Sequence, residues 1–226
     1  MTAPSEHGSA PTAAHVAWLR ESGMTALLAL LLLTIFVVPV AAPALGDAGR
    51  TAIELFYVLT LLAGAFAIAE HRRIATVVAA LAVGAVAIAW LAAPLTGTPW
   101  PFAHHAATLF ASVLLAGMVA VRVFAPGRIT GDRLMGAVAL YLLLGIAWGN
   151  AYELVAQADP AAFSVPADGA RGVERWFYFS FVTLTTVGYG DVAPLARGAR
   201  ALAIGEALVG QLFPAVVLGR LVTLQS

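Results

Sequence analysis

The chain has 226 residues, of which 61% are apolar and only 11% carry a charge. A soluble domain normally carries about 25% charged residues, so a water-soluble core would not hide this much apolar surface, and lipid is the expected solvent for most of the chain. The formal net charge of zero argues against a nucleic-acid partner, and the absence of cysteine excludes disulfides and thiolate metal sites.

The N-terminal tail, residues 1–23, is polar and lacks the form of a cleavable signal, so we expect it to be cytoplasmic. Apolar runs beyond it reach the length of about 20 residues that a helix needs to cross a bilayer. They predict an all-α membrane protein with six transmembrane helices, at Met24–Leu45, Thr51–Ala69, Ile74–Ala93, Phe102–Phe124, Leu134–Ala156 and Ala199–Leu224. Arginines in the short loops favour cytoplasmic N- and C-termini. The arginines that then lie outside are Arg50 in the first outer loop and Arg171, Arg175, Arg197 and Arg200 in the pore region.

The fourth predicted helix carries one basic residue, Arg122, at its inner end, where the excess of positive charge in cytoplasmic loops is enough to explain it. His104 and His105 lie at its outer start. An imidazole pair there is a candidate for a pH sensor or a metal site, and a solvated helix end is the simpler interpretation.

Residues 157–197, between the fifth and sixth predicted helices, are of mixed character. They include the aromatic run Trp176–Leu184, which is too short to cross a bilayer and is a candidate re-entrant segment. A few residues after it, Gly188 and Gly190 occupy alternate positions. Left-handed torsions, which glycine adopts at no steric cost, can turn successive carbonyls of an extended strand toward one axis. Such main-chain oxygens can replace the hydration shell of a cation in a narrow pore.

The sequence Thr-Val-Gly-Tyr-Gly at residues 186–190, followed by Asp191, resembles the selectivity filter of the potassium channel family. The resemblance is close for residues 174–224 and only topological for residues 24–156. It implies K+ binding by main-chain carbonyl oxygens and one hydroxyl, that of Thr186. The residues concerned are Thr186, Val187, Gly188 and Tyr189, with Gly190 and Asp191 completing the filter. A homotetramer is also implied, because one subunit offers only a quarter of the oxygen cage.

The resemblance divides the chain into three parts. A cytoplasmic tail (1–23) precedes a four-helix membrane domain (24–124) that resembles a degenerate voltage-sensor domain. A pore domain (134–226) then supplies an outer helix, a pore helix, the filter and an inner helix. The pore helix would support the filter through Trp176, Tyr178, Phe179, Thr183 and Thr185.

The aromatic residues of the pore helix have two interpretations: a cuff around the filter, or an interfacial belt. Some family members carry a glutamate on the pore helix behind the filter. Val182 occupies that position here, so Asp191 lacks that carboxyl partner.

The last helix contains Gly210, nineteen residues after Asp191, where many family members carry a hinge glycine. Pro214 follows by one turn and leaves the Gly210 carbonyl unpaired, so the pair predicts a bend that acts as a gating hinge. The alternative is that small residues such as Gly210 simply allow close packing.

Two polar side chains of the same helix are further candidates. Glu206 is an ionisable residue inside a span, which favours a specific role. We expect it to brace the pore helix rather than touch the ion, with Thr183 or Thr185 as hydrogen-bond donor and with a protonated carboxyl as one of its two forms. Gln211 has two possible roles: to face the cavity or to bond a neighbouring helix.

Steep voltage gating is not expected, because it needs tens of kcal/mol. One cationic residue in each of four subunits would supply at most about 9 kcal/mol across 100 mV. The predicted function is passive K+ permeation through a homotetramer in the bacterial inner membrane. K+ is the permeant ion, and neither a cofactor nor a soluble substrate is expected.

Three alternatives stay open: a weakly selective cation channel, a non-conducting regulatory subunit, and a secondary transporter with a filter-like loop. Against the first stand Tyr189 and both filter glycines, and against the last stands a single interrupted segment rather than a pair. An enzyme is not expected, because no nucleophile–base pair or phosphate-binding loop is evident.

Overall fold

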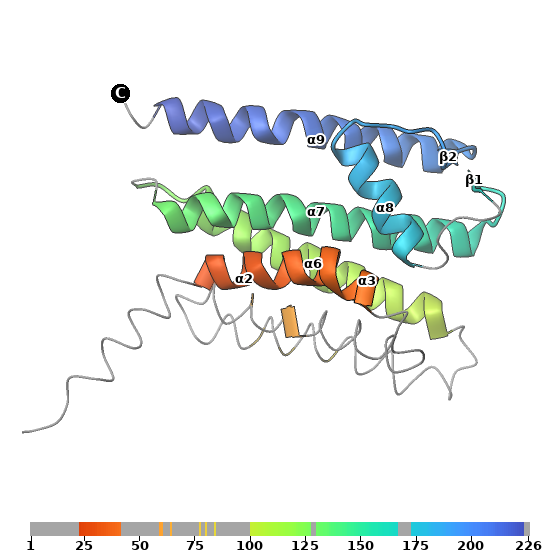
Figure 1. Ribbon diagram of the computed structural model, residues 1–226, viewed down its shortest axis with the longest axis horizontal. Coiled ribbons are helices and arrows are strands. Elements are labelled where there is room, and N and C mark those ends of the chain that lie inside the picture. The colour runs from red at the N-terminus through yellow and green to blue at the C-terminus, as the bar shows by residue number, and fades with distance from the viewer. Residues whose placement is uncertain are drawn as a thin grey trace, which may run out of the picture.

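The structure is a computed structural model, and its described residues are 23–41, 59, 60, 64, 77, 80, 84, 100–127, 130–166 and 173–223. Within them the chain is mostly helical (Figure 1). The predicted tail up to residue 22 lies outside the described residues, as do nearly all of the predicted helices at 51–69 and 74–93.

Three helices of the described residues are long and apolar enough to cross a membrane: α6 (Trp100–Val123), α7 (Gly131–Ala158) and α9 (Arg197–Thr223). They coincide with the predicted fourth, fifth and sixth spans, with ends shifted by a few residues. Thr130 caps α7 by accepting a hydrogen bond from the Arg133 amide, which pairs one of the N–H groups that a helix start leaves open. The chain is therefore a mostly helical membrane protein, as predicted.

The described part of the predicted first span is also helical. The helix α2 (Gly23–Leu32), the π-helical turn η1 (Leu33–Val37) and α3 (Val38–Ala41) follow one another without a break. In η1 the Thr34 hydroxyl donates to the Leu30 carbonyl at 2.7 Å and lies 3.1 Å from the Thr60 hydroxyl. This buried polar group is therefore paired, as burial in an apolar environment requires.

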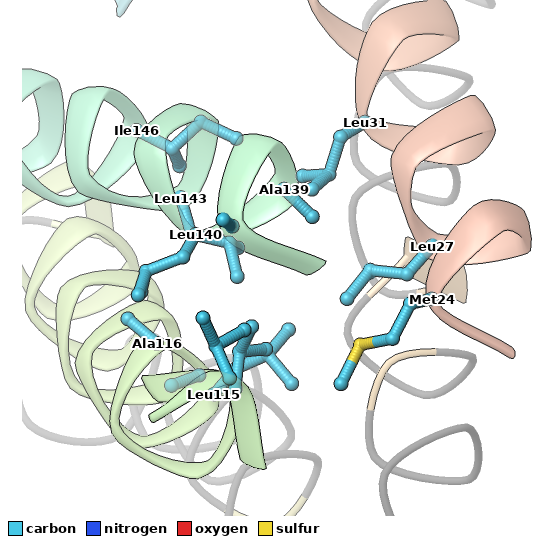
Figure 2. Packing of buried hydrophobic residues seen from close by; sticks show 13 residues of the cluster. Met24, Leu27, Leu31, Leu115, Ala116, Ala139, Leu140, Leu143 and Ile146 are labelled. Carbon is cyan, nitrogen blue, oxygen red and sulfur yellow. The ribbon is translucent and has the colours of Figure 1, made fainter. Parts of the chain in front are cut away.

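The main apolar core lies where α2, α6 and α7 meet. Figure 2 shows side chains of the three helices directed into one cluster. Its most completely buried members include Met24, Leu27, Leu31, Ala111, Leu115, Val119, Ala139, Leu143 and Ile146. This cluster holds α7 in place, and α7 in turn packs against the short helix at Val173–Leu184.

The short helix α8 (Val173–Leu184) lies between α7 and α9 (Figure 1). Two glycines of α7 allow its close approach. A Cβ atom on Gly145 would lie 2.5 Å from the Phe181 ring, and one on Gly149 would lie 3.2 Å from the Phe177 Cα atom. Small residues four positions apart are the usual means of bringing membrane helices together.

Two short strands, one at each end of the segment that contains α8, pair with each other. β1 (Phe163–Ser164) precedes α8 and pairs antiparallel with β2 (Ala193–Pro194), which precedes α9. The Leu195 amide also donates to the Ala162 carbonyl at 2.7 Å. Both ends of the segment are therefore fixed to each other.

Candidate functional site

The stretch after α8 is held to the last turn of that helix by its own backbone. The Thr186 amide donates to the Thr183 carbonyl at 2.9 Å. The Val187 and Gly188 amides both donate to the Val182 carbonyl, at 2.9 and 3.3 Å. Residues 186–188 therefore start from a defined position at the C-terminal end of α8.

Positive φ angles alternate along this stretch. Thr186 has φ +59°, Gly188 has φ +57° and Gly190 has φ +79°, and the intervening Val187 and Tyr189 do not share the positive sign. The two glycines thus adopt the left-handed torsions that the sequence predicts. Thr186 adopts one without that freedom, at a cost of about 1–2 kcal/mol for a residue with a Cβ atom. Backbone strain of this kind concentrates at functional sites.

The side chains of residues 186–191, the predicted filter and hereafter the filter stretch, are exposed in a single chain. Val187 is 53% exposed and Tyr189 is 72% exposed. The Tyr189 ring lies nearly parallel to that of Tyr178 on α8, with centroids 6.5 Å apart. Desolvation and a hydrogen bond to the Asp191 carboxylate raise the pKa of the Tyr178 phenol. The Tyr178 phenol of α8 thus faces Asp191. Val182 of the same helix offers Asp191 no carboxyl partner.

Gln211 on α9 contacts the start of the filter stretch. Its Nε2 atom donates to Thr186 Oγ1 at 2.8 Å, and both side chains are exposed. The bond reaches the residue predicted as the innermost ion ligand, a partner that neither of the two roles considered for Gln211 had named. This contact between two residues 25 positions apart joins α9 to the stretch that follows α8.

The last carbonyl of α8, that of Leu184, is enclosed by two other helices. The Tyr141 hydroxyl of α7 donates to it at 3.1 Å. On α9, a Cβ atom built on Gly210 would overlap the Leu184 oxygen and lie 2.7 Å from its carbonyl carbon. Gly210 therefore serves close packing. The helix α9 continues through Pro214 to Thr223, so the gating hinge stays a prediction.

Glu206 is completely buried behind α8. Its carboxyl oxygens lie 2.6 Å from the Tyr152 hydroxyl and 2.5 Å from Ser180 Oγ. The prediction of Thr183 or Thr185 as partners is wrong. Ser180 lies about one turn before Thr183 on α8, and Thr185 follows the end of that helix, where its hydroxyl donates back to the Phe181 carbonyl.

Aromatic side chains pack α8 against α7 and β1. Trp176 and Phe179 are buried, with Phe163 of β1 4.6 Å from Trp176 and Tyr152 of α7 4.8 Å from Phe179 between ring centroids. Tyr178 lies outside this group and faces the filter. The predicted aromatic support thus divides into a buried anchor and an exposed side chain, and Phe163 and Tyr152 were not predicted.

The other predicted candidates, the two histidines and Arg122, belong to α6, and contacts with α7 involve two of them. His105 Nδ1 lies 3.2 Å from the Asn150 side-chain oxygen, and the His104 and His105 rings meet edge to face. The described residues hold no group of three or more side chains suited to a metal ion. Arg122 forms an ion pair with Asp132 of α7 at 3.5 Å, so it has a structural contact at this end of the helix.

A short helix, a loop with alternating positive φ angles and a spanning helix together define a channel-type membrane protein. The family model described as "Ion channel" matches residues 161–225, which include all three elements. Protein LctB of Bacillus caldotenax is 37% identical over 122 residues, covering 50% of this chain and 90% of that protein. Protein LctB of Geobacillus stearothermophilus is 36% identical over 92 residues, covering 41% and 63% respectively. The chain belongs to the ion channel family.

Proposed function

We propose that the chain is one subunit of a homotetrameric, K+-selective channel with six spans and a re-entrant pore helix. The observation that carries this proposal is the alternation of positive φ at Thr186, Gly188 and Gly190. A backbone of this kind can present successive carbonyls to one axis, as a dehydrated K+ requires. It stands between α8 and α9 in the segment that matches the family model.

The uneven burial of the spanning helices supports assembly. In a single chain 61% of the spanning part of α7 is buried, against 11% for α9. The uncovered face of α9 is apolar and includes Ile204, Leu208, Leu212 and Val216. Together with the open filter side chains, it is the surface that copies of the chain would cover around a central pore.

The ion would pass along the filter stretch without any covalent step. A K+ ion exchanges its water for the carbonyls of residues 186–189 and, at the inner end, for the Thr186 hydroxyl. Gln211 occupies one lone pair of that oxygen, which leaves the second lone pair for the ion. The C-terminal end of α8 at Leu184 carries a partial negative charge that favours a cation in the cavity.

The setting proposed for the channel is the bacterial inner membrane, with both termini in the cytoplasm. The first four helices are proposed not to act as a steep voltage sensor. The ion channel family indicates transport rather than catalysis.

Reconstitution in liposomes tests the proposal directly. Purified protein should pass K+ and be blocked by barium, and its reversal potential should follow the K+ gradient rather than the Na+ gradient. A channel that passes both ions equally would identify the weakly selective alternative. Flux coupled to a second ion would identify a transporter, and no flux at all would favour a regulatory subunit.

A matched pair of variants links the flux to the filter. Gly188→Ala places a Cβ atom on a residue with φ +57°, which costs about 1–2 kcal/mol in each subunit. Gly198→Ala is the control, because a Cβ atom there meets nothing within 4 Å. We expect K+ flux or selectivity to be lost in the first variant and kept in the second. Equal flux in both would contradict the proposal.

A further inference from the structure

Glu206 joins three helices through a chain of short oxygen–oxygen contacts. One carboxyl oxygen lies 2.6 Å from the Tyr152 hydroxyl of α7, and the other lies 2.5 Å from Ser180 Oγ of α8. Ser180 Oγ also lies 2.7 Å from the Gly145 carbonyl oxygen of α7. All three distances are those of hydrogen bonds between oxygens.

Three hydrogen bonds between oxygens need three protons. Tyr152 supplies one and Ser180 supplies one, because a hydroxyl carries a single hydrogen. The Gly145 carbonyl can only accept, and so can an ionised carboxylate. If Glu206 were ionised, Ser180 would have one hydrogen for two acceptors, and one contact would bring two lone pairs together.

We infer that Glu206 is a neutral carboxylic acid that positions the pore helix. Its acid hydrogen bonds to Ser180 Oγ, Ser180 donates to the Gly145 carbonyl, and Tyr152 donates to the other carboxyl oxygen. This arrangement gives every contact one proton. It deepens the proposed function, because it names a residue outside the filter that fixes the helix from which the filter starts.

The surroundings of Glu206 agree with a neutral acid. The side chain is fully buried, and among the described residues no cationic group forms an ion pair with it. A carboxylate buried without a cation is strongly disfavoured. The titratable groups that face it are the Tyr152 and Tyr141 phenols of α7, and α8 contributes the uncharged Ser180.

Loss of the proton would break the Ser180–Gly145 hydrogen bond, one of the contacts that hold α8 on α7. Ser180 would turn its hydrogen toward the carboxylate, and its oxygen would then face the Gly145 carbonyl without a hydrogen between them. The hydrogen bonds from Glu206 to Ser180 and from Ser180 to the Gly145 carbonyl are therefore present together while Glu206 is protonated. The second of them is lost as the pH rises. Wild-type K+ flux should fall in alkaline solution.

Infrared spectroscopy of the purified full-length protein tests the protonation state without requiring conduction. A carboxylic-acid C=O band should be present at neutral pH in the wild type and absent in Glu206→Gln. In Ser180→Ala the band should shift, because the acid loses its acceptor. No acid band attributable to Glu206 at neutral pH would overturn the inference, whatever the ion selectivity of the channel.

Flux measurements give the second readout. Glutamine keeps a neutral donor and acceptor, so Glu206→Gln should assemble, conduct K+ and lose the alkaline fall in flux. If this variant assembles and keeps the wild-type pH profile, the pH response does not come from Glu206 and the inference fails. If it does not assemble, ¹³C-labelled glutamate in the wild-type protein reports the same protonation by its carboxyl chemical shift across the pH range, and an ionised signal at neutral pH overturns the inference.

Discussion

Replacement of Gly210 by alanine would place a methyl group in the contact between α9 and the end of α8. A Cβ atom there would overlap the Leu184 carbonyl oxygen and lie 2.7 Å from its carbon, whereas ordinary contact begins at 3.4 Å. The obstacle is backbone within a helix and not the tip of a flexible side chain. The two helices must therefore separate by at least about 0.7 Å, from the 2.7 Å and 3.4 Å distances.

The energetic balance of this variant is unfavourable. Alanine in place of glycine favours a helix by about 1 kcal/mol. Overpacking of this kind costs about 1–3 kcal/mol, or more. The separation also weakens the hydrogen bond from Tyr141 to the Leu184 carbonyl, worth about 1 kcal/mol. We expect a net loss of about 1–3 kcal/mol in each subunit, with displacement of the filter stretch that starts from Leu184.

Thermal unfolding of the purified protein, followed by circular dichroism, measures this loss. Gly205→Ala is the control on the same helix, because a Cβ atom there meets nothing within 4 Å of the chain. We expect Gly210→Ala to unfold at a lower temperature than Gly205→Ala and to lose K+ flux. The hinge hypothesis predicts instead an unchanged unfolding temperature with impaired opening. Equal unfolding temperatures in the two variants would therefore refute the packing argument.

Two further substitutions test single hydrogen bonds around the filter. Gln211→Leu removes the donor to Thr186; we expect lower K+ flux with an unchanged unfolding temperature, because both side chains are exposed, and unchanged flux would show that the contact has no role in conduction. Tyr141→Phe removes the hydroxyl that donates to the Leu184 carbonyl; we expect a loss of about 0.5–1.5 kcal/mol in unfolding free energy, and a variant as stable as the wild type would contradict this.

The class of the protein and the left-handed torsions at the two glycines could be read from the sequence because both depend on local patterns. Runs of about 20 apolar residues predict membrane helices whatever their neighbours are. The alternate glycines, Gly188 and Gly190, predict left-handed torsions because the preference belongs to the residue itself. The structure has helices of spanning length at three of the predicted positions and positive φ at both glycines.

Contacts between helices could not be predicted in the same way, because they depend on rotation and depth. Glu206 was expected to meet Thr183 or Thr185, but the register of α8 against α9 brings Ser180 to it. The pairing of β1 with β2 gave no signal, since each strand has two residues. The glycines of α7, Gly145 and Gly149, did carry a signal: their spacing of four residues is a known pattern of close helix packing.

In a single chain, main-chain hydrogen bonds to α8 hold the first three residues of the filter stretch, 186–188. The left-handed torsion at Thr186 costs about 1–2 kcal/mol. The bonds from Gln211 and from the Val187 and Gly188 amides contribute about 0.5–1.5 kcal/mol each, enough to offset that cost. At the outer half the Tyr189 side chain is 72% exposed and stacks on Tyr178. In the proposed tetramer, other copies of the chain would bury more of this outer half, so the order of residues 189–191 should increase on assembly.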